Sequence, residues 1–387
     1  MGGYMEVIIH KEFVSLEKLL PKWNLLKEKY YEITIFQDMS WIKSWWYCKS
    51  RQKNISPYII EIKNNKETIG VLPLYMELMR FARLHFRILK PIGSEVSDYL
   101  IPILSKEYPP EEILSSAFKK IYEDKLNWDY INWGDIPEDS FFSKFLTKQM
   151  INKHRLIEKK KADTCPFLKI SNKVEEVKCK LDEDLLKKIL SKERKLNKRG
   201  NLTFTLVTKE EEIEPVMNKF FELHIERWGR TVTPSKFLQE EEREHSMLAA
   251  KNLFQSGLLF LAYLSYNDEI IAIEFGMSDA KKIYLYLPAF NIKYRNYSVG
   301  NLLNYFIILE ACKRGYDIVD FLRGDEKHKQ EWGTAKKYNV KYEIYNHSLK
   351  SMVFKYITRA NKSKSFNYII HKLSNLSRMM SKRPHFQ

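Results

Sequence analysis

The densest run of charged side chains beside an apolar, strand-like segment is DIVDFLRGDEKHKQEWG, residues 317–333. In α/β folds, ligands bind at the carboxyl ends of strands, where such a run would lie. A carboxylate in that place can take a proton from a reacting group, so Asp320 and Asp325 are candidate general bases. Arg323 and Lys329 are candidate substrate-binding residues, with Arg323 either fixing an acceptor or organising the carboxylates. A solvated loop with a structural ion pair is the alternative.

One further carboxylate is of chemical interest because of its surroundings. Glu274 stands alone in the apolar run IIAIEFGM, residues 270–277. Burial disfavours the charged form of a carboxyl group, so an inward-facing Glu274 would have its pKa raised towards that of a useful catalytic base. If the side chain lies on the solvated face of its strand, no such role follows, and the sequence leaves both orientations open.

Asp98 and Tyr99 stand near the start of the segment SDYLIPIL (97–104), whose apolar character predicts a strand. Asp98 could face a cleft as an acceptor-binding carboxylate, with Tyr99 beside it as a second substrate-binding candidate. An aspartate that caps a turn explains the same pattern equally well.

His224, Arg227 and Trp228 lie on a helix expected over residues 209–228. His224 and Arg227 are three residues apart and therefore share one face of that helix. Together with Trp228 they are candidate contacts for an acceptor, and packing with a surface pair is the alternative.

The junction YLYLPAFNIKYRNYSVGNLL (284–303) connects an expected strand to a helix that begins near Ser298. The first N–H groups of a helix lack intrahelical partners and the helix dipole favours an anion, so Ser298, Gly300 and Asn301 could hold a diphosphate. Gly300 allows a ligand to approach the backbone closely, and Arg295 adds positive charge. An ordinary strand-to-helix connection capped by Ser298 is the alternative.

The chain has 387 residues, and its 65 Lys and Arg exceed its 49 Asp and Glu by 16. Residues 187–199 hold seven basic residues and one acidic residue, and residues 350–387 hold nine basic residues and no acidic one. These two stretches, at +6 and +9, carry 15 of the 16 charges, and the remainder is nearly neutral. The overall composition therefore gives little support to nucleic-acid binding.

Several classes of protein are disfavoured by the sequence. A hydrophobic content of 44% argues against disorder, and no apolar run is long enough to span a bilayer. The N-terminal residues do not resemble a signal peptide, and four scattered cysteines indicate a reduced, cytosolic protein. Glycine-rich phosphate loops and the GxSxG and HExxH motifs are absent, and the histidines lack metal-ligand spacing, so we expect no metal.

The same order of expected elements occurs twice along the chain. Each half shows a helix, several antiparallel strands, a helix, a strand, a helix and a strand. This order predicts an α/β (α+β) protein with two tandem lobes, each a mixed, mostly antiparallel sheet flanked by helices. The expected divisions are 1–160, 161–350 and 351–387, and the last is a basic amphipathic helical tail.

The second half resembles the GNAT acyltransferase fold, and the chain resembles more narrowly the CelD-type (cellulose-biosynthesis-protein-like) GNAT acetyltransferases. The matching pieces follow one another in family order and are SWIKSWW (40–46), IGVLPLYM (69–76), SDYLIPIL (97–104), ELHIERW (222–228), YSVG (297–300) and DFLRGDEKHKQEWG (320–333). The last piece is the most specific. The chain departs from the family pattern at His328, where a tyrosine is usual, and at Val299, where a proline is usual.

The resemblance implies an acyl-CoA-dependent N-acetyltransferase built from two GNAT-like lobes, as in the Fem-type aminoacyltransferases. Acetyl-CoA or another acyl-CoA would be the co-substrate, and an amine would attack its thioester directly, without a covalent enzyme intermediate. The expected acceptor is an amino sugar of a cell-envelope polysaccharide or its precursor.

The resemblance also implies where coenzyme A would lie. Its pantetheine arm would lie between the strands KKIYLYLPAF (281–290) and DIVDFLRG (317–324), against the backbone of Leu287, Pro288 and Ala289. Its diphosphate would occupy the turn that comprises Arg295, Tyr297, Ser298, Val299, Gly300 and Asn301.

Two other functions stay open. A Fem-like transferase would use aminoacyl-tRNA and bind it through the basic helix 187–199, although the long helical hairpin frequent in the second lobe of those enzymes is not expected here. A non-catalytic adaptor on a degenerate acyltransferase fold would contact a membrane surface or a nucleic acid through the basic tail. We expect a cytoplasmic protein whose tail could hold it against the inner face of the membrane; the oligomeric state is not predicted.

Overall fold

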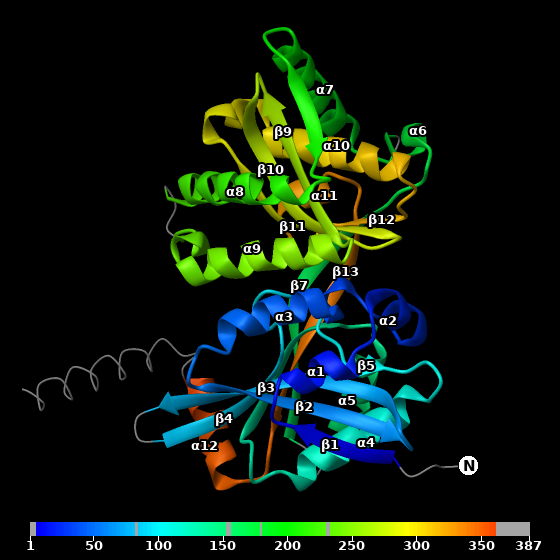
Figure 1. Cartoon of the computed structure of the whole chain (residues 1–387), viewed down its shortest axis with the longest axis vertical. Helices are drawn as coiled ribbons and strands as arrows, with labels where there is room; N and C mark the ends of the chain where they lie inside the picture. The colour runs from blue at the N-terminus through cyan, green and yellow to red at the C-terminus, as the bar shows by residue number, and fades with distance from the viewer. Residues whose placement is uncertain (1–4, 82–83, 152–155, 179, 230–232, 361–387) are drawn as a thin grey trace, which may run out of the picture.

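The computed structural model describes residues 5–81, 84–151, 156–178, 180–229 and 233–360, and shows two lobes stacked along the long axis (Figure 1). The strands of the first lobe are β1 (Met5–His10), β2 (Ile55–Asn64), β3 (Glu67–Phe81), β4 (Leu84–Pro91), β5 (Ile103–Leu104) and β6 (Tyr130–Pro137). Its helices are α1 (Val14–Leu19), α2 (Trp23–Lys29), η1 (Ile35–Gln37), α3 (Met39–Lys49), α4 (Pro110–Glu123) and α5 (Phe141–Met150).

The second lobe contains the remaining elements, and two long strands extend from it into the first lobe (Figure 1). These two strands are β7 (Leu156–Lys169) and β13 (Ala335–Tyr345). The other strands are β8 (Leu202–Leu206), β9 (Leu259–Tyr266), β10 (Glu269–Ser278), β11 (Lys282–Phe290) and β12 (Ile318–Asp320). The helices are α6 (Val174–Lys178), α7 (Glu183–Asn197), η2 (Glu210–Glu212), α8 (Ile213–Trp228), η3 (Lys236–Leu238), α9 (Glu240–Gln255), η4 (Ile292–Tyr297), α10 (Val299–Lys313) and α11 (Lys327–Gln330). Helix α12 (Leu349–Ala360) follows β13 and packs on the first lobe.

The strands form one continuous path of neighbours, β1-β2-β3-β4-β6-β13-β7-β12-β11-β10-β9-β8, with β5 paired to β3. Among these pairs, β4–β6 and β11–β12 are parallel and the others are antiparallel. The expected mixed, mostly antiparallel sheet flanked by helices is therefore confirmed. Because β7 and β13 pair along most of their lengths, they join the sheets of the two lobes into one.

The second lobe has a helical layer on each face of its sheet, because its strands are apolar on both faces. Helices α8 and α9 pack on one face, where Phe220 and Leu253 meet Phe275 of β10. Helices α7 and α10 cover the other face, where Ile307 packs in the same core as Ile271. Strands β9, β10 and β11 form an antiparallel meander, and the turn before β10 uses Asn267 and Asp268. Strand β12 ends at the junction between the lobes, where Asp320 contacts Tyr99 of the first lobe.

Helix α3 of the first lobe packs against α9 of the second lobe, which fixes the junction between them. Trp41 and Trp45 of α3 are buried in a core cluster that continues into α8, α9 and β10. On the surface, Arg51 makes a bidentate pair with Glu244 at 2.6 and 2.8 Å. The two lobes therefore share part of their hydrophobic core.

The prediction of a strand over residues 97–104 is wrong for most of that segment. Only Ile103 and Leu104 belong to a strand, and the preceding residues form a buried loop. Pro102 cannot donate a ladder hydrogen bond, and the N–H of Leu100 instead donates to the Asp135 carbonyl at 2.8 Å. Asp98 and Tyr99 therefore lie on this loop.

The charged stretch EKKKAD (158–163), where the first division was expected, is part of β7. Its charges are compensated by neighbours, since Lys159 lies 2.8 Å from Glu138 and Lys160 pairs with Glu343. The expected division at residue 160 thus falls inside this strand. The tail expected over 351–387 begins within α12, and residues 361–387 lie outside the described part of the chain.

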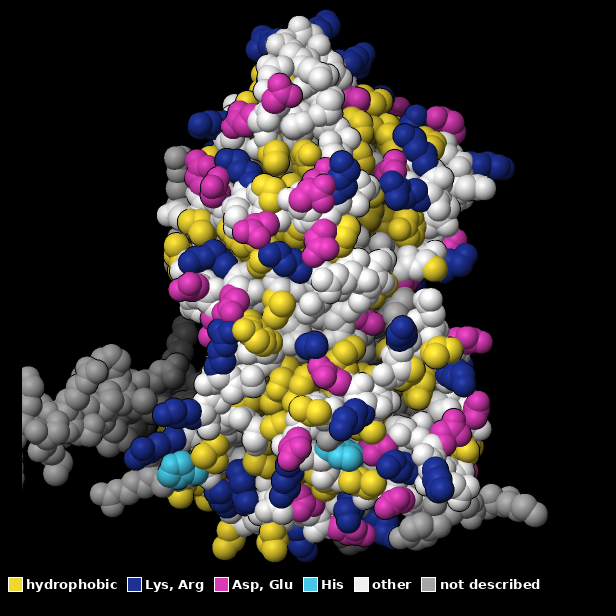
Figure 2. Space-filling model, viewed as in Figure 1, with side chains coloured by type: hydrophobic (Ala, Val, Ile, Leu, Met, Phe, Trp, Pro, Cys, Tyr) yellow, Lys and Arg dark blue, Asp and Glu magenta, His cyan; other side chains and the backbone are white. Residues whose placement is uncertain are grey.

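Acidic and basic side chains are interspersed over the face of the molecule shown in Figure 2. This distribution agrees with the nearly neutral body expected from the sequence. None of the described helices is long and apolar enough to cross a membrane.

Candidate functional site

Strands β11 and β12 separate in the middle of the second lobe. Their parallel pairing ends with Tyr284 opposite Asp320, and β12 stops there. Strand β11 continues to Phe290 and, among the described strands, pairs over this outer half with β10 alone. We call the position between Tyr284 and Asp320 the branch point, beyond which one edge of β11 has no neighbouring strand.

A β-bulge lies directly beyond the branch point. The register between β10 and β11 shifts, so that Leu285 and Tyr286 lie opposite the single residue Gly276. A Cβ atom at Gly276 would lie 2.7 Å from the Tyr284 carbonyl oxygen, so a side chain at this position requires backbone movement. Bulges bend the strand that carries them, which turns the outer half of β11 away from the course of β12.

Glu274 lies on β10 opposite Pro288, next to the bulge. Its side chain is buried, and its Oε1 atom has no hydrogen-bond partner among the described residues. Burial raises the pKa of Glu274 to about 8, opposed by Lys329 and by the backbone N–H groups of Leu287 and Tyr286. Of the two orientations that the sequence left open, the inward one is present; the catalytic role stays a prediction.

Asp320 lies at the branch point and is only 1% exposed. The Tyr99 hydroxyl donates to its carboxylate and lies 3.0 Å from both oxygens, and the Leu322 N–H donates at 3.0 Å. The ammonium group of Lys337 is 3.7 Å from Oδ2. Burial raises the pKa of Asp320, and Lys337 opposes this effect. The first lobe thus supplies a direct partner to the second lobe's branch point.

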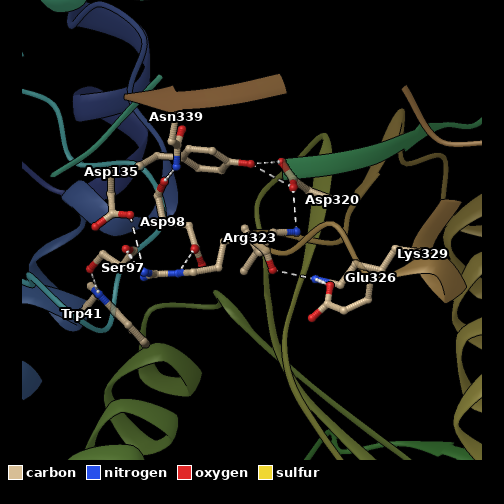
Figure 3. A network of polar contacts seen from close by, with 11 residues as sticks. Trp41, Ser97, Asp98, Asp135, Asp320, Arg323, Glu326, Lys329 and Asn339 are labelled. Atoms are coloured by element: carbon tan, nitrogen blue, oxygen red, sulfur yellow. Dashed lines mark hydrogen bonds and ion pairs between the residues drawn. The ribbon is translucent and has the colours of Figure 1, made fainter. Parts of the chain in front are cut away.

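Arg323 connects the two lobes through a network of polar contacts (Figure 3). Its Nε atom pairs with Asp98, its Nη2 donates to the Ser97 carbonyl at 2.5 Å, and its Nη1 lies 3.4 Å from Asp135. Burial raises the pKa of Asp98 to about 6, although Arg323 lowers it, so the carboxylate is mainly ionised at neutral pH. These contacts agree with one of the two roles expected for Arg323, the organisation of carboxylates.

Lys329 and Asp325 have different surroundings. The Lys329 ammonium donates to the Arg323 carbonyl at 2.6 Å, and its side chain is 13% exposed. Asp325 is exposed and pairs with Lys336 at 2.9 Å, which lowers the pKa of Asp325. The structure therefore brings Lys329 within electrostatic reach of Glu274, whereas Asp325 belongs to a surface pair.

The expected anion-binding junction consists of η4 followed by α10. Ser298, between them, has a left-handed φ of 52°, and its side chain does not cap α10. The Leu302 N–H donates to the Ser298 carbonyl and so begins the hydrogen-bond ladder of the helix. The N–H groups of residues 299–301 precede that ladder and are available to a ligand.

The side chains of this junction differ in what they can contribute. Val299 is buried in the core, so its backbone N–H alone can serve a ligand. Arg295 is exposed and Tyr297 is half-buried. A Cβ at Gly300 would meet the Phe290 ring at 3.7 Å, an ordinary contact, so a methyl group fits there whereas a longer side chain would project over the N–H groups.

Of the three candidates on α8, Arg227 lies beside this junction. His224 is buried, its Nδ1 is 2.8 Å from the Ser235 hydroxyl, and burial lowers its pKa to about 4, so the ring is neutral at pH 7. Its ring stacks on Trp228. The half-buried guanidinium of Arg227 lies 4.2 Å from the ring centroid of Phe290, with no ion pair among the described residues. Arg227 therefore borders the α10 N-terminus, whereas the Arg323 network is built from other residues.

A pocket of about 370 Å³ opens between the lobes at the branch point, where Asp320 forms part of its wall. Four lysines line it, namely Lys27 and Lys106 from the first lobe and Lys282 and Lys337 from the second. No sequence pattern marks these residues, because each is a single lysine on a different segment and only the fold brings them together. We call this cavity the lysine pocket.

The described residues contain no group of three or more His, Cys, Asp or Glu side chains that could hold a metal ion. Three cysteines within the described ranges, Cys48, Cys165 and Cys312, are buried free thiols. Burial raises the pKa of Cys165, which disfavours a thiolate nucleophile at that position.

Comparison with known proteins matches residues 184–330 to the family model of the acetyltransferase (GNAT) domain. A search of curated proteins gives no match. Among solved structures, FemX is 11% identical over 90% of this chain and 99% of its own, with a TM-score of 0.59. A conserved protein of unknown function from Bacteroides thetaiotaomicron VPI-5482 is 11% identical over 88% of this chain and 100% of its own, with a TM-score of 0.54.

At such low identity, these two structures show a common fold alone. The fold similarity extends over both lobes, and the family match covers β8 to α11 and therefore includes the branch point and the α10 junction. Residues 184–330 thus match the GNAT acetyltransferase domain, and the chain has a two-lobed mixed α/β fold similar to that of FemX.

Proposed function

We propose that this protein is an N-acyltransferase that transfers an acyl group from acyl-CoA to an amine acceptor. The observation that carries the proposal is the branch point. Beyond it, one edge of β11 is uncovered and leads along the chain to the α10 N-terminus. A long, thin ligand with a diphosphate at one end is complementary to that combination of strand edge and helix end.

The residues of this region fit acyl-CoA. The N–H groups of residues 299–301, with Arg227 and Arg295 nearby, would hold its phosphates. The backbone of Leu287 and Ala289 on β11 would bind the pantetheine arm, and Pro288, which has no N–H, could contribute only its carbonyl group. When bound, acyl-CoA supplies the activated thioester.

Glu274 is the group best suited to remove a proton from the acceptor amine. An amine must be neutral to attack, and a base whose pKa lies near the working pH takes its proton most effectively. Burial places the pKa of Glu274 at about 8, and its Oε1 atom has no partner among the described residues. Asp320 is a second possible base, but Tyr99 already donates to both of its oxygens.

The acceptor would enter between the lobes, where the lysine pocket reaches the branch point. Asp98, Tyr99 and Arg323 hold this junction together and so position the two sides of the site. An amino sugar of a cell-envelope polysaccharide is the acceptor that the CelD-type resemblance suggests, and this finer assignment is part of the proposal.

The proposal is tested by thermal unfolding with a panel of acyl-CoAs, followed by an assay of acyl transfer to amino sugars. We expect at least one acyl-CoA to raise the unfolding temperature and its acyl group to be transferred to an amine. Unfolding temperatures that no acyl-CoA changes, measured on folded protein, would contradict the proposal.

A second candidate function is a Fem-like transfer from aminoacyl-tRNA, and the position of α7 favours it. Lys192 of this basic helix donates to the Asn296 carbonyl at 2.7 Å, so α7 borders the anion-binding junction. This candidate predicts tRNA binding that is lost when Lys187, Lys188, Lys192 and Arg194 are neutralised together. Acyl-CoA binding that is unchanged in the same variant would favour the first function.

A further inference from the structure

Four lysine side chains line the lysine pocket, and two of them form ion pairs with carboxylates. Lys27 pairs with Asp279 at 3.1 Å, and Lys337 lies 3.7 Å from Asp320. Lys106 donates to two main-chain carbonyl groups, of which the closer is 2.5 Å away, so no carboxylate neutralises it there.

Lys282 is the most unusual of the four. It lies half-buried on β11, two positions before the branch-point residue Tyr284. No hydrogen bond or ion pair of its ammonium group occurs within the described ranges. Burial lowers the pKa of Lys282, and the neighbouring charges of Lys337 and Lys27 lower it further, whereas the carboxylates of Asp320 and Asp279 oppose this effect. Like charges that converge in a half-buried pocket repel one another unless a bound anion compensates them.

Two further carboxylates line the pocket, Glu32 and Asp139, and neither replaces such an anion. Both oxygens of Glu32 accept from the Phe141 N–H, at 3.1 and 3.0 Å, so this side chain is committed to the start of α5. No ion pair among the described residues joins Glu32 or Asp139 to any of the four lysines. The lysine side of the pocket therefore keeps an excess of positive charge.

The location of this charge is informative, because the pocket and the branch point share Asp320. A molecule in the pocket would have one end among the lysines and another at the place where β11 and β12 separate. A volume of about 370 Å³ is small for a ligand site and suits a group of monosaccharide size.

We propose that the lysine pocket binds the acceptor through an oxyanion, a phosphate or carboxylate group carried by an amino sugar, with Lys282 as its direct partner and Lys27 and Lys337 adding to the positive charge around it. The acceptor is thus an anionic amine rather than a neutral one, and its amine lies towards the branch point. This inference rests on the proposed function, since it names the substrate class of the same site.

The test is a calorimetric titration of the full chain with glucosamine 6-phosphate, with muramate, an amino sugar that carries a carboxylate, and with glucosamine. Saturating coenzyme A is present throughout, so that the α10 junction is not a competing anion site. We expect one or both anionic sugars to bind at least tenfold more tightly than glucosamine. A phosphate source and a carboxylate source are distinguished by which of the two binds.

Two variants assign that binding to the pocket. Lys282→Met should weaken the binding of the anionic sugar at least tenfold. The matched control is Lys281→Met, which removes the same charge from the adjacent position, where the side chain is 65% exposed and pairs with Asp317 at 3.2 Å. Equal affinity of the wild type and Lys282→Met, or the absence of binding by both anionic sugars, would overturn the inference.

A second measurement needs no variant. Acetic anhydride labels unprotonated lysines, and mass spectrometry reports the labelled positions. We expect labelling of Lys282 in the free protein and its protection by the anionic sugar that binds, whereas Lys281 is labelled equally in both samples. If the sugar does not reduce the labelling of Lys282, binding of the sugar in the lysine pocket is contradicted.

Failure of the inference can be told from failure of the proposed function. Anion binding that depends on Lys282, without acyl transfer from any acyl-CoA, supports anion binding in the lysine pocket and contradicts the proposed acyltransferase function. Acyl transfer to glucosamine 6-phosphate with the same KM in Lys282→Met and wild type, and a KM no lower than that for glucosamine, supports the acyltransferase and overturns the anionic acceptor.

Discussion

The Tyr99 hydroxyl lies 3.0 Å from both carboxylate oxygens of Asp320 and donates to them. Tyr99 belongs to a buried loop of the first lobe, and Asp320 ends β12 at the branch point of the second. The acceptor side of the site therefore depends on residues from both lobes.

Replacing Tyr99 by phenylalanine removes the hydroxyl donor and leaves a buried carboxylate less well paired. We expect Tyr99→Phe to lower the free energy of unfolding by about 1–3 kcal/mol, the usual cost of an unsatisfied buried polar group. Urea denaturation measures this quantity. Tyr338→Phe removes a hydroxyl from a residue that is 53% exposed and should have little effect. Equal stabilities of the two variants would show that the contact with Asp320 does not stabilise the fold.

The Arg323–Asp98 pair should be far more important for stability than a surface pair. Arg323→Ala leaves the buried Asp98 carboxyl without its cationic partner, and we expect a loss of about 3–5 kcal/mol in unfolding free energy. Arg314→Ala is the control, because its pair with Glu310 lies on the surface of α10 and should contribute less than about 1 kcal/mol. Adding Asp98→Asn to Arg323→Ala should recover part of the loss; a double variant no more stable than the single one would contradict this account.

Glu274 should determine the pH dependence of activity. Because the pKa of Glu274 is about 8, the ionised base becomes more abundant as the pH rises from 6 to 8, and kcat/KM should increase with it. Glu274→Gln should reduce kcat/KM about a hundredfold or more at pH 8. It should also remove the increase with pH, except for the part that comes from deprotonation of the acceptor amine itself. Asp325→Asn serves as the control and should keep the wild-type profile, since Asp325 is exposed and paired with Lys336. A wild-type profile in Glu274→Gln would exclude Glu274 as the base.

The same residue should make the protein less stable at high pH. The pKa of Glu274 rises from an ordinary 4.5 to about 8 on folding, so between these values the folded state binds more protons than the unfolded state. The free energy of unfolding should therefore fall as the pH rises from about 4.5 to about 8. In Glu274→Gln this contribution is absent, and the variant should gain stability relative to wild type between pH 5 and pH 9, as measured by urea denaturation. A difference in unfolding free energy between the two proteins that stays constant over this pH range would rule out the raised pKa of Glu274.

The sequence was most informative where local pattern alone determines the environment. Glu274 is flanked by apolar residues that must be buried, so an inward carboxylate could be proposed from its neighbours. The start of α10 near Ser298 was likewise visible as a strand followed by a polar turn and an amphipathic helix. The absence of a side-chain cap at Ser298 could not be predicted from the sequence, because it depends on a left-handed backbone conformation.

Features that arise from contacts between distant segments could not be found in the same way. The apolar run after Ser97 resembles a strand, yet Pro102 and the contact of Asp98 with Arg323 favour a buried loop. The charges of residues 158–163 suggested a division between domains because their partners, such as Glu343, lie far away in the chain. Lys282 could not be predicted as a binding residue for the same reason, because the other lysines of the pocket come from distant segments.

The central claim is that acyl-CoA binds along the uncovered edge of β11 with its diphosphate at the α10 N-terminus. A calorimetric titration with acetyl-CoA of wild type, Gly300→Ala and Gly300→Glu tests it most directly. Gly300→Ala should bind as wild type does, because its methyl group meets the Phe290 ring at an ordinary 3.7 Å. Gly300→Glu places a negative charge beside the diphosphate and should weaken binding on the order of a hundredfold. Tight acetyl-CoA binding that is the same in all three proteins would contradict the claim.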